Sequence, residues 1–473
     1  MKIKEIEISF LRSALEVEGI NIKTDQFFQW INERRRAVDV KIDLIPFSKL
    51  HKWGFDALTG NLQHVTKKFF SIEGIEVKTN WGGVSSWTQP IINQPEIGFL
   101  GIITKKIDGV LHFLMQAKIE PGNINCVQLS PTLQATKSNY SRVHKGKSPL
   151  YLEYFNGGKK VDVLLDQLQS EQGARFLKKR NRNIIIEVNE DIQVYENFCW
   201  LTLGQIKHLL LTDNLINMDT RTVISGISFG TYLMSELTFL NSDGLFYKSN
   251  QEMLHSALTN EISLKSIEEI ISWITNLKSK YELEVNRIPL NQVKDWIVSG
   301  TEIHHIENKY FSVIGANIFI ENREVLNWSQ PLVRSAQEGL IGFIVKKIKG
   351  IYHFLVQAKI EAGNFDILEL APTVQCLTGN YRTGVNEYEV PFINEFLNVP
   401  KDRIIFKTFQ SEEGGRFYLE QNLNMIIEAS ENFPEFVPEN YCWMTLNQLF
   451  SFIKYNNYLN IQARSLLAAI TFN

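Results

Sequence analysis

Hydrophobic and polar side chains alternate along two stretches of the chain, residues 110–120 and 351–361. Because successive side chains of a β-strand point to opposite faces, this alternation predicts one strand in each stretch. The apolar face of the first strand carries Phe113, Met115, Ala117 and Ile119. Its other face carries His112, Leu114, Gln116, Lys118 and Glu120. An apolar face packs on a core, whereas a polar face either meets water or lines a cleft, and the pattern leaves both interpretations open.

Each strand is expected to follow a hairpin turn. Asp108-Gly109 and Lys349-Gly350 precede the two strands, and glycine tolerates the positive φ of such turns. The preceding segments, which begin at Gly98 and Gly339, have the pattern of the partner strands. The sequence therefore predicts a β-meander in two places.

The two meanders belong to a long internal repeat. Adding 241 to a residue number in the first copy gives its counterpart in the second, so that His112 corresponds to His353 and Glu120 to Glu361. A match this long, with polar residues in step, indicates a duplicated unit. Short strands, glycine turns and flanking helices in each copy predict an α+β fold. We expect a lead-in over 1–23, a first unit over 24–229, a connecting segment over 230–266 and a second unit over 267–473.

Composition narrows the possible functions. The chain has 473 residues, a net charge of −3 and four cysteines, none of them in a Cys-x-x-Cys pair. The charge argues against bulk nucleic-acid binding, and no apolar run approaches the ~20 residues that a membrane helix needs. The first residues lack the apolar region of a signal peptide. We therefore expect a cytoplasmic protein that binds neither nucleic acid nor membrane.

Acid–base groups are the chemistry that remains once common motifs are excluded. The chain has no phosphate-binding loop, no dinucleotide fingerprint and no serine nucleophile elbow, and the adjacent pair His304-His305 lacks metal-ligand spacing. No metal and no cofactor is expected. Paired candidates for proton transfer occupy equivalent positions of the two copies: Glu120 and Glu361, His112 and His353, Lys118 and Lys359, and Tyr140 and Tyr381. A lysine two residues from a glutamate on one strand face could prepare it as a general base or could form a purely structural pair.

Arginine and tryptophan pairs are candidates for substrate binding. Arg175 and Arg416 could clamp a phosphate with two hydrogen bonds or could form ion pairs. Trp53 and Trp296, and likewise Trp87 and Trp328, could stack on a nucleobase or sugar or could pack in the core.

Several motifs together resemble the NDP-hexose 2,3-dehydratase family of deoxysugar biosynthesis. They are Trp87-Thr-Gln-Pro with Gly98-Phe-Leu-Gly, Gln116-Ala-Lys-Ile-Glu-Pro-Gly-Asn, Leu129-Ser-Pro-Thr-Leu-Gln, Ser138-Asn-Tyr and Gln169-Ser-Glu-x-Gly-x-Arg-Phe, with their partners in the second copy. The resemblance implies two tandem Nudix-like units, a homodimer, and a substrate of the type dTDP-4-keto-6-deoxyglucose. The implied reaction removes water across C2 and C3. The sequence shows no intact Nudix metal signature, so pyrophosphate hydrolysis is not expected.

The implied chemistry suits the candidate residues. A C4 ketone acidifies the C3 proton, a base removes that proton, and an acid helps the C2 hydroxyl to leave. Glutamate or histidine is the expected base, and tyrosine or lysine the expected acid. The resemblance also implies ligand contacts at Trp53, Gln134, Thr136, Lys137, Ser138, Asn139, Trp296, Thr373, Val374, Gln375 and Asn380. The alternatives are a non-catalytic nucleotide-sugar binding protein and a Nudix-type hydrolase.

Overall fold

The computed structural model describes residues 2–136, 148–237, 249–321, 325–377 and 390–473. Its helices are α1 (Lys2–Leu15), α2 (Thr24–Arg36), α4 (Leu203–Leu209), α5 (Met218–Ser225), α6 (Gln251–Leu258), α7 (Ile267–Lys280), α9 (Ile393–Leu397), α10 (Leu446–Ile453) and α11 (Ile461–Ala468). The short 3-10 helices are η1 (Phe47–Lys49), η2 (Leu152–Tyr154), η5 (Leu290–Gln292) and η6 (Lys401–Arg403).

The strands of the first half are β1 (Val40–Ile45), β2 (Trp53–Phe55), β3 (Leu62–His64), β4 (Ser71–Thr79), β5 (Ser86–Asn93), β6 (Gly98–Ile107), β7 (Val110–Ile119), β8 (Val127–Ser130), β9 (Leu133–Ala135), β10 (Asp162–Ser170), β11 (Arg180–Glu187) and β12 (Phe198–Thr202). Those of the second half are β13 (Leu283–Ile288), β14 (Trp296–Val298), β15 (Glu302–His305), β16 (Phe311–Ile320), β17 (Asn327–Ser335), β18 (Gly339–Ile348), β19 (Ile351–Lys359), β20 (Glu369–Ala371), β21 (Val374–Leu377), β22 (Ile404–Ser411), β23 (Gln421–Glu428) and β24 (Tyr441–Thr445).

Each half of the molecule contains a large mixed sheet. The strand order is β10-β11-β6-β7-β12 in the first half and β22-β23-β18-β19-β24 in the second, with two short strands added to each sheet. The predicted hairpins are confirmed, because Ile107 pairs with Val110 and Ile348 with Ile351. The parallel pairing of β11 with β6, and of β23 with β18, makes the sheets mixed. The architecture is α+β with two repeated halves, as the sequence predicts.

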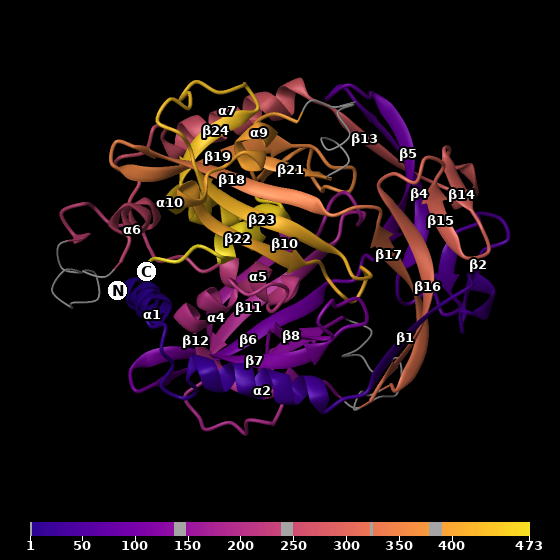
Figure 1. The fold of residues 1–473 in the computed structure, drawn as a ribbon, viewed down its shortest axis with the longest axis horizontal. Coiled ribbons are helices and arrows are strands. Elements are labelled where there is room, and N and C mark those ends of the chain that lie inside the picture. Colours follow the sequence, from indigo (N-terminus) through magenta and orange to yellow (C-terminus); the bar gives the residue numbers. More distant parts are fainter. Residues whose placement is uncertain (1, 137–147, 238–248, 322–324, 378–389) are drawn as a thin grey trace.

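The smaller sheets exchange one strand between the halves. Strand β1 pairs with β16 of the second half, with Val40 opposite Ile320. Strand β13 pairs in the same way with β4 of the first half, with Leu283 opposite Thr79. Figure 1 shows indigo β1 running along orange β16 at one side of the molecule. Each repeat therefore completes the sheet of the other, an arrangement that no pattern in the sequence had indicated.

Two glycine turns form backbone hydrogen bonds between the halves. The Gly122 N–H donates to the Gly414 carbonyl over 2.7 Å, and the Gly363 N–H donates to the Gly173 carbonyl over 2.6 Å. A Cβ atom at Gly122 would lie 1.5 Å from the carbonyl oxygen of Phe417, and one at Gly363 would lie 1.8 Å from that of Phe176. Only glycine permits backbones to approach this closely. Each turn directly follows a candidate catalytic glutamate.

The first helix of the chain takes part in the repeat. The Ser13 hydroxyl of α1 donates to the Leu111 carbonyl and accepts the Leu203 N–H, and the Ser256 hydroxyl of α6 makes the same two bonds with Tyr352 and Leu446. Helices α1 and α6 therefore occupy equivalent places on β7 and β19. Within the described residues, no helix is both long and apolar enough to cross a bilayer.

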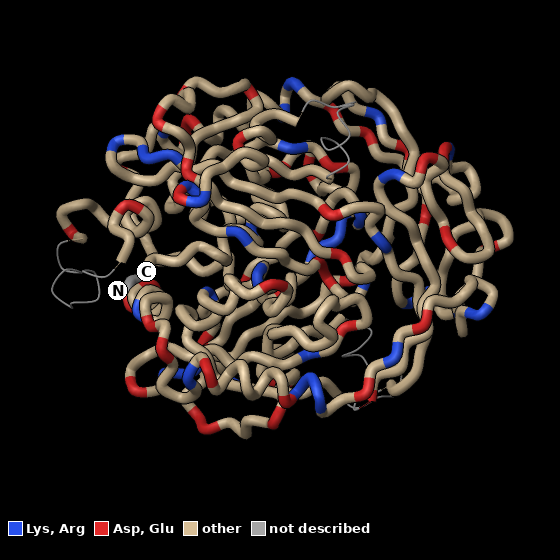
Figure 2. The backbone as a smooth tube through the Cα atoms, viewed as in Figure 1, with Lys and Arg blue, Asp and Glu red and all other residues tan. Residues whose placement is uncertain are grey.

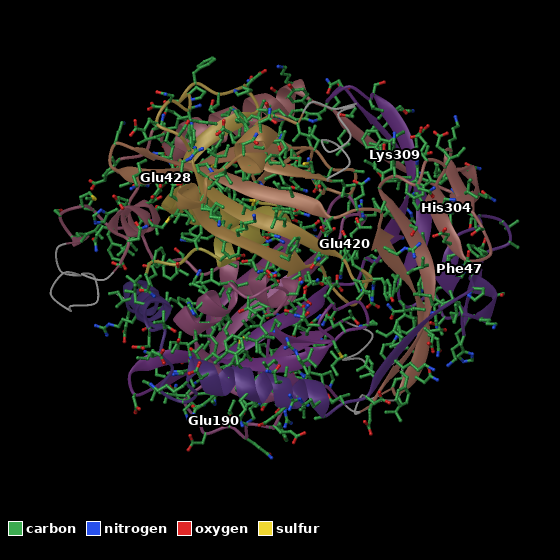
Figure 3. All side chains as sticks on the ribbon, viewed as in Figure 1. Phe47, Glu190, His304, Lys309, Glu420 and Glu428 are labelled. Carbon is green, nitrogen blue, oxygen red and sulfur yellow. The ribbon has the colours of Figure 1, made fainter. Side chains whose placement is uncertain are left out.

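Charged residues lie inside the molecule as well as at its rim (Figure 2). The largest fully buried side chains include Arg221 and Arg464, each from the last helix of one repeat. Arg221 donates to the Ser411 carbonyl of the other repeat, and Arg464 donates to the Ser170 carbonyl. In Figure 3, Glu420 lies toward the middle of the molecule, whereas Glu190 and Glu428 lie nearer its edge. The contact between the repeats thus includes buried charged side chains besides apolar ones such as Phe176 and Phe417.

Candidate active site

The candidate histidines and glutamates do not share a site, although they lie on one strand face. His353 and Glu361 are eight residues apart, which corresponds to about 26 Å along a strand at roughly 3.3 Å per residue. His112 and His353 are fully buried, and the Nδ1 atom of each lies near the carbonyl of the residue two positions earlier. Burial lowers the pKa of both imidazoles. The histidines therefore lie apart from the glutamates along the strands, and their catalytic role stays a prediction. The polar faces are buried or half-buried.

Glu361 lies at the end of β19, where its side chain is 8% exposed. Its Oε1 atom accepts a hydrogen bond from Gln375 Nε2 over 2.9 Å. Lys359 Nζ lies 3.5 Å from the Gln375 carbonyl oxygen. The Oε2 atom of Glu361 is buried without a hydrogen bond of ordinary geometry among the described residues, and the Gly173 N–H of the other repeat also favours this carboxylate. A buried carboxylate oxygen without a partner is available to a ligand or water.

The opposite repeat supplies the arginine beside Glu361. Arg175 is held in the loop after β10, and its guanidinium lies 4.3 Å from the centroid of the Phe311 ring. The Phe311 ring lies 4.7 Å from the ring of Trp296. The glutamate and the two aromatic rings thus belong to the second repeat, whereas the arginine belongs to the first. Both repeats therefore contribute side chains to this site.

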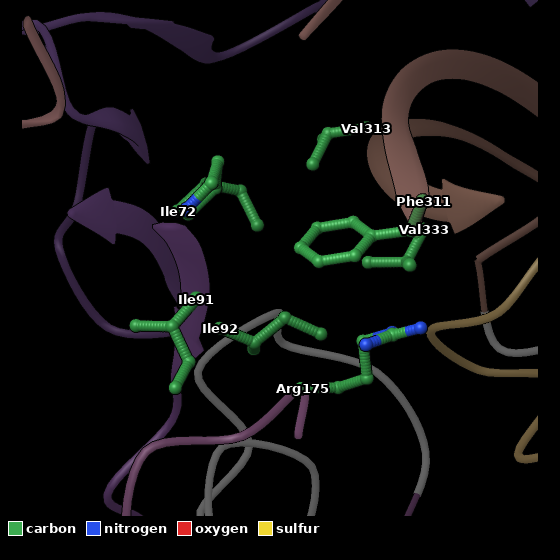
Figure 4. A pocket seen from close by; sticks show the side chains of 8 residues that line it. Ile72, Ile91, Ile92, Arg175, Phe311, Val313 and Val333 are labelled. Carbon is green, nitrogen blue, oxygen red and sulfur yellow. The ribbon is translucent and has the colours of Figure 1, made fainter. Parts of the chain in front are cut away.

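A narrow apolar pocket adjoins Arg175 between the two small sheets. Figure 4 shows the Arg175 side chain next to Phe311 and Val333, with Ile72 and Ile92 on the facing side. The pocket measures about 160 Å³, including space open to solvent. Ligand pockets usually measure ~300–1,000 Å³, so this gap is too small for a nucleotide sugar.

Glu120 has matching surroundings in the other half. Its Oε1 accepts from Gln134 Nε2 over 2.7 Å, its Oε2 has no partner among the described residues, and Lys118 Nζ donates to the Gln134 carbonyl over 3.2 Å. The arginine here is Arg416, which lies 4.2 Å from the Phe70 ring centroid. The Phe70 ring in turn lies 4.8 Å from that of Trp53.

The two sites differ in the ionisable groups around them. Glu120 interacts electrostatically with Asp219 of its own repeat and with Glu413 of the other. The equivalent positions in the second site are Gln462 and Gln172. Near Glu361 the additional acid is Glu369, where the first repeat has Gln128.

Burial shifts the pKa of these carboxyl groups upward. It raises the pKa of Glu361, and Lys359 opposes the shift most strongly, followed by the hydrogen bond from Gln375 and the charge of Arg175. Burial also raises the pKa of Glu369 to about 7. Burial, followed by the charges of Glu413 and Glu120, raises the pKa of Asp219 well above its usual range. Burial also raises the pKa of Glu413, beside Glu120, to about 7, so each site has an acidic neighbour that can exchange protons near neutral pH.

Carboxylates also surround the candidate phosphate-binding arginines. Arg175 interacts with Glu420, Glu361 and Glu412, and burial is the main cause that lowers its pKa. Arg416 interacts with Glu413, Glu120 and Glu96, and burial lowers its pKa as well. Both arginines thus lie near carboxylates of the protein itself.

Trp87 and Trp328, two predicted substrate contacts, are instead linked by hydrogen bonds to the loops that carry the arginines. The Trp87 indole N–H donates to Gln89 Oε1 over 2.8 Å, and Gln89 Nε2 donates to the Ala174 carbonyl, next to Arg175. Trp328, Gln330 and the Gly415 carbonyl repeat this chain beside Arg416. Both indole N–H groups are therefore already satisfied by the protein.

The remaining candidates for substrate binding differ in accessibility. Thr373 and Val374 are 1% exposed, and the Thr373 hydroxyl donates to the Leu355 carbonyl and accepts the Ile344 N–H. The Thr373 side chain therefore ties β18 to β19 rather than facing a ligand. Thr136 directly follows β9 and is half-buried. The following candidates lie outside the described residues: Lys137, Ser138, Asn139, Tyr140, Asn380 and Tyr381.

Comparisons with known proteins all match this chain to the same family. The sequence model of the family described as NDP-hexose 2,3-dehydratase matches residues 24–227 and 267–470. The chain belongs to this family. A protein of Saccharopolyspora spinosa named dTDP-4-dehydro-6-deoxy-alpha-D-glucopyranose 2,3-dehydratase is 44% identical over 98% of this chain and 94% of its own length. Proteins of the same name from Amycolatopsis orientalis and Streptomyces violaceoruber are 41% and 40% identical, over 97% and 94% of this chain and 92% and 97% of their own lengths.

In this member of the NDP-hexose 2,3-dehydratase family, several polar residues at the sites escaped the sequence analysis. Asp219, Glu369 and Glu413 lie far from the glutamates along the chain, and only folding brings them near. The sequence did contain a signal for the helices that begin beside the sites. Asn217 and Asn460 each precede a helical stretch, and asparagine is a common N-cap residue. Across the described residues, no group of three or more histidine, cysteine, aspartate or glutamate side chains is arranged to hold a metal ion.

Proposed function

We propose that this protein removes water across C2 and C3 of a dTDP-linked 4-keto-6-deoxyhexose to give the 3,4-diketo-2,6-dideoxy sugar. The observation that carries the proposal is the match, at 40–44% identity over nearly the whole chain, to three proteins named for that dehydration. The two buried glutamates, each with one unpaired carboxylate oxygen, supply the acid–base equipment that such a reaction needs.

We place the productive chemistry at Glu361. Its Oε2 atom takes the C3 proton, which the C4 ketone makes acidic. The electron pair moves into an enolate whose oxygen at C4 is stabilised by a nearby cation, and Lys359 is the described cation closest in sequence to Glu361. The C2 hydroxyl then leaves as water after it receives a proton. The resulting enol, with its hydroxyl on C3, accepts a proton at C2 and becomes the diketone.

The choice of Glu361 over Glu120 follows from their neighbours. A general base works in its ionised form, and nearby positive charges favour that form. Asp219 and Glu413 interact with Glu120, whereas Glu361 has Gln462 and Gln172 at the equivalent positions and Glu369 as a neighbouring acid. Lys359 and Arg175 both favour the ionised form of Glu361. Arg175, which is already surrounded by carboxylates, supports this base in our proposal and does not clamp the diphosphate.

The remaining expectations are part of the same proposal. We infer Nudix-like topology for each repeat, a homodimeric assembly and a cytoplasmic location from the family resemblance. Trp53 and Trp296 are proposed to contact the nucleotide, since each is half-buried beside an arginine-stacked phenylalanine. Sedimentation of the purified chain measures its assembly directly, and a monomer at micromolar concentration would contradict the homodimer.

The decisive experiment follows the reaction of the keto sugar by mass spectrometry. Wild-type protein is expected to give a product lighter by one water. The variant Glu361→Gln, which keeps the side chain's size, should lower kcat by about 10²–10⁴-fold, the usual contribution of a general base. The matched variant Glu120→Gln should keep kcat within about threefold.

Three results would contradict the proposal. Full turnover in Glu361→Gln would remove that glutamate from the chemistry. Binding of the substrate without loss of water would indicate a non-catalytic binding protein. Release of a nucleoside monophosphate in the presence of magnesium would indicate a Nudix-type hydrolase.

A further inference from the structure

The N-terminus of α11 connects to Glu361 through two amide side chains. Asn460 caps this helix, and its Oδ1 atom accepts the Ala463 N–H over 2.9 Å. The cap fixes the orientation of the Asn460 amide, because the oxygen must face the helix. The Nδ2 atom therefore points away and donates to Gln375 Oε1 over 2.7 Å.

The orientation of Asn460 determines that of Gln375. A primary amide has one oxygen that accepts and one nitrogen that donates. Since Gln375 Oε1 receives the bond from Asn460, its Nε2 must face the other way, where it donates to Glu361 Oε1 over 2.9 Å. The helix thus forces a donor, not an acceptor, toward the glutamate.

We propose that Asn460 is a positioning residue of the dehydratase reaction, which acts through Gln375 to keep Glu361 in the ionised form that a general base requires. A donor toward Oε1 favours the carboxylate over the carboxylic acid. It also fixes the side chain so that the buried Oε2 atom, which has no partner among the described residues, remains available for the substrate proton. This inference rests on the proposed function.

Other charged groups also act on Glu361. Lys359 lies on the same strand, Arg175 comes from the loop after β10, and Glu369 comes from β20. Arg175 in turn faces Glu412 and Glu420. None of these groups contacts Asn460 in a described hydrogen bond, so a change at Asn460 leaves them in place.

The first repeat contains the same chain with one additional bond. Asn217 Oδ1 accepts the Thr220 N–H over 2.8 Å, and its Nδ2 donates to Gln134 Oε1 over 3.3 Å. The Ser130 hydroxyl donates to the same Gln134 atom over 3.0 Å, whereas the second repeat has Ala371 at that position. Gln134 therefore keeps its orientation without Asn217, whereas in the second repeat Asn460 is the only described donor to Gln375 Oε1.

The test replaces Asn460 by aspartate. Aspartate caps a helix about as well as asparagine, so the thermal midpoint is expected to stay within about 2 °C. It cannot donate to Gln375, so the glutamine amide should reverse and present its oxygen to Glu361. Only a protonated Glu361 can donate to that oxygen. We therefore expect the acidic limb of the pH profile of kcat to move upward by about one pH unit, which is tenfold in kcat on that limb, with little change in KM.

The matched variant Asn217→Asp makes the same change in the other repeat, where Ser130 still orients Gln134. Its pH profile is expected to keep the wild-type position. A profile of Asn460→Asp that coincides with wild type, while Glu361→Gln is inactive, would overturn the positioning role and leave the proposed function intact. A shift in Asn217→Asp alone, together with an inactive Glu120→Gln, would overturn both the role of Asn460 and the choice of Glu361.

Discussion

The surroundings of Glu120 and of Glu361 share their backbone, their glutamine, their lysine and an arginine from the opposite repeat. They differ in charge, because Asp219 and Glu413 face Glu120 and the equivalent positions near Glu361 are glutamines. The shared features depend on hydrogen bonds and close packing, so few substitutions are tolerated at those positions. Electrostatic neighbours can change while volume is preserved. The comparison therefore teaches that a duplicated scaffold can keep one hydrogen-bond geometry while the acidic residues around it change.

The strongest way to break the comparison is to disturb the geometry that the sites share. Gly363→Ala and Gly122→Ala each place a Cβ within 1.8 Å of a backbone oxygen of the opposite repeat. Because backbone cannot move aside cheaply, we expect each variant to lower the free energy of unfolding by more than about 3 kcal/mol. Denaturant unfolding measures the change. Gly300→Ala is the control, since nothing lies within 4 Å of its Cβ position. Unequal costs for the two glycines, with one near zero, would contradict a shared scaffold.

A smaller effect on stability is expected at one position where only the second site has an acid, Glu369, and the first has Gln128. Glu369 Oε2 accepts the Ser170 hydroxyl, and Gln128 Oε1 accepts the Ser411 hydroxyl in the same manner, so Glu369→Gln preserves the contact. The pKa of Glu369 is raised to about 7 in the folded protein from 4.5. Its contribution to stability is therefore present below pH 4.5 and is lost as the pH rises to about 7.

The measurement compares unfolding of wild type and Glu369→Gln between pH 4.5 and pH 8. The stability of the variant relative to wild type should increase with pH over this window, by up to roughly 1.4 kcal/mol per pH unit and roughly 3 kcal/mol in total. Gln128→Glu, which makes the first repeat resemble the second, should add a pH dependence of the same sign. Parallel stability curves for all three proteins would show that Glu369 ionises normally.

The smallest effect on activity is expected at the histidines. His353 and His112 are fully buried at the opposite end of their strands from the glutamates. His353→Gln should leave kcat/KM within about threefold of wild type, while loss of buried packing lowers the unfolding free energy by about 1–3 kcal/mol. Steady-state assays at a temperature where both proteins are folded test this. A loss of activity as large as that of Glu361→Gln would favour histidine as the base.

Much of the local structure could be predicted from the sequence. Alternation predicted β7 and β19, and glycine turns predicted their hairpins, because both depend on neighbouring residues. The same alternation placed His353 and Glu361 on one strand face, but it did not show that the two side chains lie far apart along the strand. A shared face says nothing about the distance along a strand, and this strand is longer than a sugar.

The duplication, the family and the paired glutamates were determined by the sequence alone, because they reside in the order and spacing of residues. Tertiary structure alone decided that β1 and β13 change places, that Arg175 lies near the glutamate of the other repeat, and that Asp219 and Glu413 lie near Glu120. The physical reason is that proton affinity depends on burial and on charges within a few ångströms. Residues from distant segments supply those charges only after the two repeats have packed together.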